Sequence, residues 1–256
     1  MPELRPFAGL RPAPVVVGPL GNFVCPPYDV ITEEQRLELL ARSPYNFVRV
    51  ELPAGHYGEA ARLLSEWKST GALRRDPAPA LYGYRMSYTA PDGRVRQTLG
   101  VIGALGLEGP GQGILPHEQT TPKAKTDRLE LLRATHANTS PIWCLCVEPG
   151  LASALTPASA GAEGHVGEGV GDGAGADSGE GSGKDSGEAT GADVGAEPGA
   201  RPGATRAAPP TSEVTDDDGN KHELWCITDP AVHRAVAGVV GAGPLLVADG
   251  HHRYET

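Results

Sequence analysis

The C-terminal end of the chain reads Pro244-Leu-Leu-Val-Ala-Asp-Gly-His-His-Arg-Tyr-Glu-Thr256 and carries the most informative local pattern of the sequence. Its residues 245–248 are all apolar and show no polar alternation, which is typical of a strand buried on both faces. Asp249 and Gly250 interrupt this run, because glycine allows the backbone angles of a sharp turn. A helix is expected to begin at His251, so the stretch predicts a buried strand, a glycine turn and a helix start.

This strand–turn–helix pattern predicts an anion site. Backbone N–H groups at such a helix start point outward and favour negative charge. Arg253 adds a planar, permanently charged group that suits phosphate. The residues predicted to bind phosphate here are Gly250, His251, His252 and Arg253. The alternative is a surface turn with two solvated histidines, and a run of four residues is too short to decide between the two.

A second group of polar residues lies within the stretch 114–128 and is interpreted as a loop that converges on a ligand. The side chains expected to bind the negative charge of the ligand are Thr120, Lys123, Lys125 and Arg128. Glu118 or Asp127 is expected to perform acid–base chemistry or to hold Mg²⁺. A solvated loop is the alternative. His117-Glu118 lacks a second histidine three residues later, so the motif of a metalloprotease is absent.

Residues 150–220 differ in composition from the rest of the chain. No Phe, Tyr or Trp occurs between Trp143 and Trp225, and Gly, Ala, Ser and acidic residues dominate. Such a segment buries too little apolar area to offset its chain entropy, so it is predicted to be disordered. It contains 13 acidic and 3 basic residues, which accounts for the whole net charge of −10. The remainder is neutral, which argues against a broad basic face that binds nucleic acid.

The sequence also predicts where the protein resides. No apolar run approaches the roughly 20 residues that cross a bilayer, so no membrane partner is expected. The N-terminus lacks the apolar core of a signal peptide. The four cysteines, Cys25, Cys144, Cys146 and Cys226, form no C-x-x-C pair and are interpreted as reduced thiols packed in the core. A cytoplasmic location follows.

Periodicity predicts the other elements. Strands are expected at Val15–Val17, Asn46–Leu52 and Tyr82–Tyr88, the last paired in a hairpin with Gln97–Leu107. Helices are expected after Thr32 as N-cap, over Tyr57–Gly71, from about Asp127, and after Asp229-Pro230. Trp143–Val147 and Leu224–Thr228 are both expected to be strands and, by their similar character, antiparallel neighbours.

Several motifs together resemble one bacterial family, called domain of unknown function 1015. They are Cys25-Pro-Pro-Tyr-Asp-Val-Ile31, His117-Glu-Gln-Thr120, Asp127-Arg-Leu129 and Asp249-Gly-His-His-Arg253. The last motif also resembles the phosphate loop of the ParB/sulfiredoxin-like fold, whose members bind ATP, ADP or CTP. The resemblance implies an α+β fold, in which a mixed sheet packs against helices and includes a ParB/sulfiredoxin-like nucleotide-binding portion.

The same resemblance divides the chain into three parts. Residues 1–149 and 221–256 are expected to form the family domain, and residues 150–220 to be a long disordered insertion within it. Members of the family are typically longer, so the chain is expected to be a fragment that lacks a C-terminal portion.

Three functions are considered from the sequence. The first is a nucleotide-dependent enzyme, such as a small-molecule kinase, that uses ATP or ADP with Mg²⁺. Glu118 or Asp249 would then orient the acceptor hydroxyl of a small-molecule partner. The alternatives are a non-catalytic, ParB-like regulatory module that binds a nucleotide, and a phosphohydrolase with the histidines as acid and base. No direct nucleic-acid partner is expected from this fragment, and the oligomeric state is left open.

Overall fold

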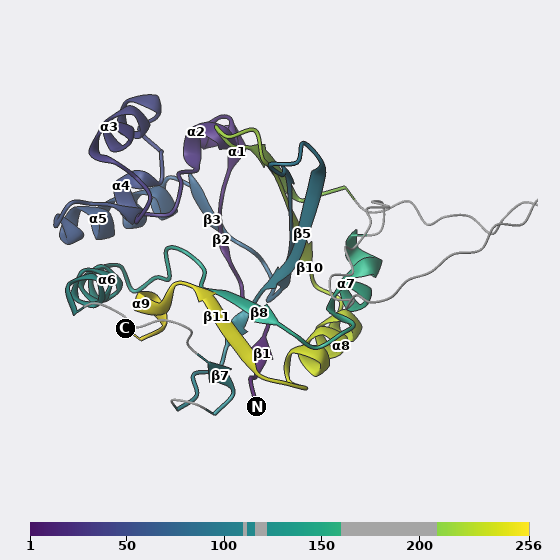
Figure 1. The fold of residues 1–256 in the computed structure, drawn as a ribbon. Helices are drawn as coiled ribbons and strands as arrows, with labels where there is room; N and C mark the ends of the chain where they lie inside the picture. Colours follow the sequence, from purple (N-terminus) through teal and green to yellow (C-terminus); the bar gives the residue numbers. More distant parts are fainter. Residues whose placement is uncertain (110–111, 116–121, 160–208, 256) are drawn as a thin grey trace, which may run out of the picture.

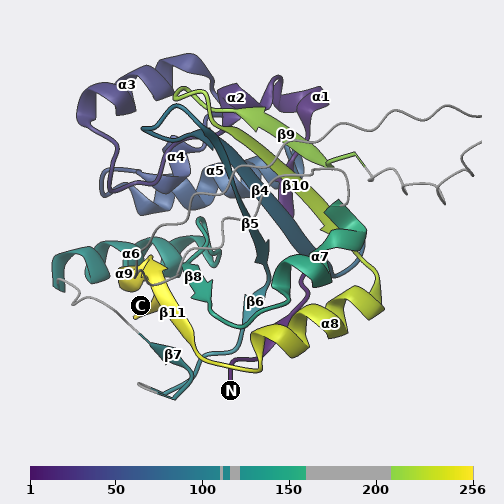
Figure 2. The same ribbon diagram turned by 45° about the vertical axis from the view of Figure 1, so that its right-hand side comes forward.

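A computed structural model describes residues 1–109, 112–115, 122–159 and 209–255 of the chain (Figure 1). The fold is α+β, with small, mostly antiparallel sheets and helices packed on both sides of them. Figures 1 and 2 show α3, α4, α5 and α6 on one side of the sheets, and α7 and α8 together on the other. Their bounds are α3 Glu33–Arg42, α4 Val48–Glu51, α5 Tyr57–Ser69, α6 Pro122–Thr135, α7 Leu151–Ser159 and α8 Pro230–Val240.

The largest sheet has the strand order β5-β4-β10-β9 and is antiparallel throughout. Its strands are β4 Leu81–Thr89, β5 Val95–Ile102, β9 Ser212–Thr215 and β10 Lys221–Ile227. The hairpin predicted between the first two is confirmed, and its turn contains Gly93 at a φ of 75°. Along β4, Tyr82 is buried at 3% exposure, whereas Tyr84, Met86 and Tyr88 are partly exposed.

A second sheet has the order β7-β11-β8 and places the C-terminal strand in its centre. Its strands are β7 Ile114–Leu115, β8 Trp143–Cys146 and β11 Leu245–Asp249. β11 runs parallel to β7 and antiparallel to β8. The prediction that β8 and β10 are neighbours is therefore wrong. Because β10 has β4 on one edge and β9 on the other, it has no edge left for β8.

The N-terminal segment takes part in two further sheets of two strands each. β1 Leu4–Arg5 pairs with β6 Ala104–Leu105, and β2 Leu10–Pro12 pairs with β3 Leu73–Arg75. Two short helices follow β2, namely α1 Pro14–Val17 and α2 Leu20–Phe23. The strand predicted at Val15–Val17 is thus wrong. Pro14 occupies the first helical turn, where its fixed φ favours a helix start.

The strand predicted at Asn46–Leu52 is also wrong, since the segment contains helix α4. Its apolar alternation resembles a strand, but Asn46 is fully buried and binds the backbone on both sides. The side-chain amide donates to the carbonyls of Asn22 and Val24, each at 3.0 Å. Its Oδ1 accepts from the N–H of Val48 at 3.1 Å, which favours a helical turn there.

Three helices confirm the predictions made from their caps and periodicity. Thr32 and Gln35 form a capping box at the start of α3. Helix α5 buries Ala60, Leu64 and Trp67, and Gly71 follows it at a φ of 75°. Asp229 caps α8 by accepting a hydrogen bond from the N–H of Ala231.

Other boundaries differ from the prediction. Helix α6 begins at Pro122, five residues before Asp127, where the sequence placed its start. Within the predicted disordered segment 150–220, helix α7 and strand β9 are folded. The reason is tertiary: Leu155 of α7 is 1% exposed in a cluster with α8, and β9 pairs with β10. The prediction for residues 160–208 lies outside the described residues.

The apolar core has two parts. One lies between α5, α6 and the N-terminal helices and includes Phe23, Val50, Leu64, Trp67 and Leu131. The other lies between α7, α8 and the sheets and includes Leu81, Trp225, Ile227, Val236 and Leu245. In the part of the chain that the structure describes, no helix has the length and apolar character needed to cross a membrane.

Candidate functional site

The strand, turn and helix start predicted at the C-terminal end are confirmed. Val247 in β11 is fully buried, and Gly250 has a φ of 89°, a left-handed conformation that favours glycine. Helix α9, His251–Tyr254, follows at once and is four residues long. Gly250 therefore places the α9 side chains directly beside the end of β11.

Arg253 turns back over this loop. Its Nη2 donates to Asp249 Oδ2 at 2.8 Å, and its Nη1 donates to the hydroxyl of Ser140. A Cβ atom at Gly250 would lie 3.0–3.3 Å from the Arg253 guanidinium, so a larger residue would have to displace this group slightly. The side chain of Arg253 is 12% exposed. Its guanidinium is thus held inward by protein groups.

Ser140 connects Arg253 to the buried carboxylate of Glu51. Its hydroxyl donates to Glu51 Oε1 at 2.8 Å. Arg128 in α6 approaches the same carboxylate, since its Nη1 lies 3.4 Å from Oε1 and donates to the Glu51 backbone carbonyl at 3.0 Å. Both side chains are 3% exposed. Glu51 therefore connects the arginine of α9, through Ser140, to the arginine of α6.

Arg128 is held on its other sides by an acid and an aromatic ring. Its Nε donates to Asp127 Oδ2 at 2.9 Å, and its guanidinium lies 3.9 Å from the ring centroid of Tyr28. Tyr57 donates its hydroxyl to Asp127 Oδ1 at 2.7 Å, which raises the pKa of Tyr57. Burial raises the pKa of Tyr28.

These contacts form one continuous chain, here called the arginine network. Its members come from four separate segments and are Glu51, Asp127, Arg128, Ser140, Asp249 and Arg253. Figures 1 and 2 show α6 and α9 side by side, next to the end of β11. Two buried atoms of the network, Glu51 Oε2 and Arg253 Nε, have no hydrogen-bond partner among the described residues. One is a hydrogen-bond acceptor and the other a donor, and both atoms are buried.

Cys25 lies beside this network. Burial, together with the negative charge of Glu51, raises the pKa of the Cys25 thiol to about 12. The thiol is therefore protonated at neutral pH. All four cysteines are free, as expected, but each is partly exposed rather than buried in the core.

The structure brings together five of the residues predicted from the sequence: Asp127, Arg128, Asp249, Gly250 and Arg253. Lys123 and Lys125 lie in the first half of α6, and their side chains are outside the description. Glu118 and Thr120 lie outside the described residues. His251 is 2% exposed, and His252 is partly exposed.

The sequence analysis missed Glu51, Ser140 and Tyr28 as members of this site. Glu51 follows the apolar positions Val48 and Val50. A charged residue beside such positions could have indicated a buried functional group. Ser140 had no such signal, because its partner Glu51 is 89 residues earlier in the chain. Tyr28 belongs to the Cys25–Ile31 motif but was not assigned a role.

The carboxylates of the site would hold a metal ion only together with further ligands, such as the phosphates of a substrate. Among the described residues, no three His, Cys, Asp or Glu side chains come close enough to hold a metal by themselves. Mg²⁺ commonly uses one or two carboxylates together with the phosphates of its substrate. Asp127 and Asp249, at 37% and 49% exposure, are the carboxylates that remain accessible for this role.

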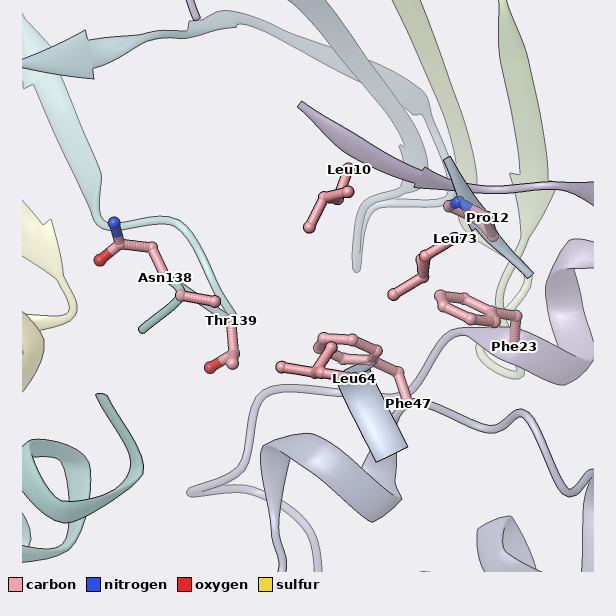
Figure 3. A pocket seen from close by; sticks show the side chains of 9 residues that line it. Leu10, Pro12, Phe23, Phe47, Leu64, Leu73, Asn138 and Thr139 are labelled. Carbon is pink, nitrogen blue, oxygen red and sulfur yellow. The ribbon is translucent and has the colours of Figure 1, made fainter. Parts of the chain in front are cut away.

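A mostly apolar cavity of about 280 Å³ lies next to the network (Figure 3). Its lining residues are Leu10, Pro12, Phe23, Phe47, Leu64, Leu73, Ala137, Asn138 and Thr139. Figure 3 shows the apolar side chains on one side and Asn138 and Thr139 on the other, with the Asn138 amide turned away from the apolar group. The cavity is therefore suited to an apolar group.

Comparison with known proteins identifies a family but gives no activity. The model of one family, described as a protein of unknown function (DUF1015), matches residues 4–168 and 200–256. Every residue of the arginine network falls within these ranges. No curated protein and no solved structure matches the chain.

Proposed function

Because the chain belongs to the DUF1015 family of proteins of unknown function, we propose an activity from its site. The chain binds a nucleotide, ATP or ADP with Mg²⁺, at the arginine network and transfers a phosphoryl group to a small molecule. The loop Asp249–Arg253 is the part that resembles the phosphate loop of the ParB/sulfiredoxin-like fold. A cytoplasmic location, where such nucleotides are abundant, agrees with this activity.

The observation that carries the proposal is the link between a buried arginine, Arg128, and a partly buried one, Arg253, through Ser140 and Glu51. Buried ion pairs contribute little net stability compared with apolar packing, so stability alone does not account for this network. Guanidinium groups are the side chains best matched to phosphate, because they bind its oxygens through parallel N–H donors. Clusters of buried charges are also typical of functional sites.

Phosphate binding requires a local exchange of partners. The Arg253 guanidinium is bound to Asp249 and Ser140, and an incoming phosphate replaces one of these contacts. Its Nε is a further donor, which the same exchange has to expose because the atom is buried beside Gly250. Arg128 lies on the other side of Glu51 and neutralises charge on the transferred group. Within the proposal, Thr120, Lys123 and Lys125 add further contacts to the phosphates.

The acceptor is oriented by a carboxylate. In the transfer, the acceptor oxygen forms a bond to the terminal phosphorus, the bond from this phosphorus to the bridging oxygen of the nucleotide breaks, and the hydroxyl proton passes to a carboxylate. Glu51 Oε2 is buried and lacks a partner among the described residues, so it is well suited to accept that hydrogen bond. Asp249 and Glu118 are the other carboxylates proposed for this role, and Mg²⁺ bridges the phosphates.

A nucleotide screen tests the proposal. The melting temperature of the protein is measured with ATP, ADP, CTP and GTP in the presence of Mg²⁺, because a ligand that binds only the folded state raises it. The expected result is a rise with ATP or ADP that is lost in Arg253→Ala and kept in Arg133→Ala. Arg133 is an exposed arginine of α6 that pairs with Glu130, and it serves as the matched control. No rise with any nucleotide, in a protein that melts cooperatively, would contradict the proposal.

Analysis of products then separates the three activities considered from the sequence. A phosphorylated small molecule supports the phosphotransferase. A bound but unchanged nucleotide indicates a regulatory module, and free phosphate indicates a phosphohydrolase. The last two outcomes would overturn the transfer step while keeping the nucleotide site.

A further inference from the structure

We infer that the apolar cavity between β2, β3, α5 and residues 137–139 receives the heterocyclic base of the nucleotide. The inference rests on the proposed function, because it assigns the base of a nucleotide whose phosphates occupy the arginine network. The cavity would form a second part of the nucleotide site, separate from the part that binds the phosphates.

The lining is formed by side chains that the fold already holds in place. Phe23, Leu64 and Leu73 are 5–6% exposed and belong to the N-terminal core cluster. Phe47 packs against the same cluster, with its ring centroid 5.7 Å from that of Phe23. Such a wall is rigid, so the cavity does not have to form when a ligand arrives.

The cavity and the network share two segments of the chain. Thr139 lines the cavity and its neighbour Ser140 belongs to the network, so their Cα atoms are about 3.8 Å apart. Phe47 lines the cavity, and Glu51 follows it by one helical turn, since the Glu51 N–H donates to the Phe47 carbonyl at 2.9 Å. The cavity and the arginine network therefore lie next to each other at both segments.

The two halves select for a ligand with two different ends. One end is apolar and flat enough to lie against phenyl rings and leucines, and the other carries negative charge for Arg253 and Arg128. A nucleotide has these properties, because a base packs against apolar and aromatic side chains and the sugar places its phosphates a short distance away. An inorganic phosphate or a small polar phosphate ester would leave the cavity unused.

Calorimetric titration of the full chain tests the inference with three probes: ATP with Mg²⁺, adenosine, and inorganic triphosphate with Mg²⁺. Ala137→Leu adds bulk at the cavity wall, and Ala41→Leu makes the same change on the exposed surface of α3 as a control. The expected result for Ala137→Leu is loss of adenosine binding, at least tenfold weaker ATP binding and unchanged binding of triphosphate. The control is expected to behave as wild type.

The outcomes separate this inference from the proposed function. Wild-type protein that binds triphosphate but not adenosine overturns the base site and leaves the phosphate site standing. Wild-type protein that binds adenosine but not triphosphate overturns the phosphate site and supports the cavity. Equal ATP affinity in wild type and Ala137→Leu also overturns the base site. If Ala137→Leu does not melt cooperatively, Leu10→Phe narrows the cavity from the opposite wall and replaces it in each comparison.

Discussion

Arg128 in α6 and Glu51 at the end of α4 face each other with both side chains only 3% exposed. Their closest atoms, Nη1 and Oε1, are 3.4 Å apart, and the same Nη1 donates to the Glu51 backbone carbonyl at 3.0 Å. One guanidinium thus satisfies both a backbone and a side-chain acceptor of the same residue. This contact joins α6 to α4 within the arginine network.

Truncation of this arginine is predicted to destabilise the protein strongly. Arg128→Ala leaves the buried Glu51 carboxylate without its guanidinium, which costs about 3–5 kcal/mol. Arg133→Ala, on the same helix but exposed, removes a surface ion pair and costs at most about 1 kcal/mol. Urea unfolding of both variants measures the difference. Equal losses of unfolding free energy in the two variants would show that the buried Arg128–Glu51 pair contributes no more to stability than an exposed ion pair.

Replacing both members of the pair gives a further comparison. Arg128→Met combined with Glu51→Leu removes both buried charges, so the double variant is predicted to be more stable than Arg128→Ala alone. The same double variant is predicted to lose nucleotide binding. A double variant that is less stable than Arg128→Ala would contradict the charge argument.

Replacement of Gly250 is predicted to lower both the stability of the protein and its affinity for the nucleotide. A control variant at a glycine with a similar backbone angle separates the two effects. Gly250→Ala places a Cβ at a φ of 89°, which costs about 1–2 kcal/mol, and also 3.0–3.3 Å from the Arg253 guanidinium. Gly55→Ala has a similar φ of 85° but meets nothing within 4 Å. Both variants are expected to lose stability, whereas only Gly250→Ala is expected to lose nucleotide affinity. Equal nucleotide affinity in the two would show that the position of Arg253 is irrelevant to binding.

Acid stability is predicted to depend on Asp76. Hydrogen bonds from the Arg11 guanidinium hold the pKa of this buried carboxyl below its usual value of 3.8. A lowered pKa stabilises the folded state above the ordinary pKa, and this contribution is lost as the pH falls through the folded-state pKa. The stability difference between wild type and Asp76→Asn is therefore expected to shrink below a pH of about 4.

Unfolding by urea across the acid range measures this difference. Asp218→Asn is the control, because Asp218 is an exposed residue of the turn before β10. Its difference from wild type is expected to be small throughout. If the difference for Asp76→Asn is the same at neutral and at acid pH, the ion pair with Arg11 does not contribute through its charge.

Cys25 is predicted to resist alkylation in the folded protein. With a pKa of about 12 against the usual 9.0, its thiolate population, and hence its rate with iodoacetamide, falls roughly a thousandfold. Glu51→Gln removes one of the two causes of this shift, so it is expected to speed the reaction. Peptide mapping after timed alkylation measures both rates. Rapid labelling of Cys25 in the folded wild type would contradict the assignment.

Local patterns in the sequence predicted the parts of the fold that depend on neighbours along the chain. The buried strand before Asp249, the turn at Gly250 and the capped start of α3 were all predicted, because each depends on a few adjacent residues. The helix at Val48–Glu51 was missed, because bonds from Asn46 to carbonyls 22 and 24 residues earlier override the alternation.

The site was predicted only in part for a similar reason. Arg128, Asp249 and Arg253 were identified by residue type and motif. The partners that connect them, Ser140 and Glu51, become visible only when residues 89 and 113 positions apart come together. The placement of β8 beside β11 rather than β10 likewise depends on which sheet edges are free, and no local pattern reports that.

The most direct test of the central claim is calorimetric titration of the full chain with ATP and Mg²⁺, for wild type, Arg253→Lys and Arg133→Lys. Lysine keeps the charge but loses the parallel donors of the guanidinium. The account predicts saturable binding to wild type, about tenfold or greater weakening in Arg253→Lys, and no change in Arg133→Lys. Absence of binding to wild type, or equal affinity in all three proteins, would contradict the claim that the arginine network holds the phosphates.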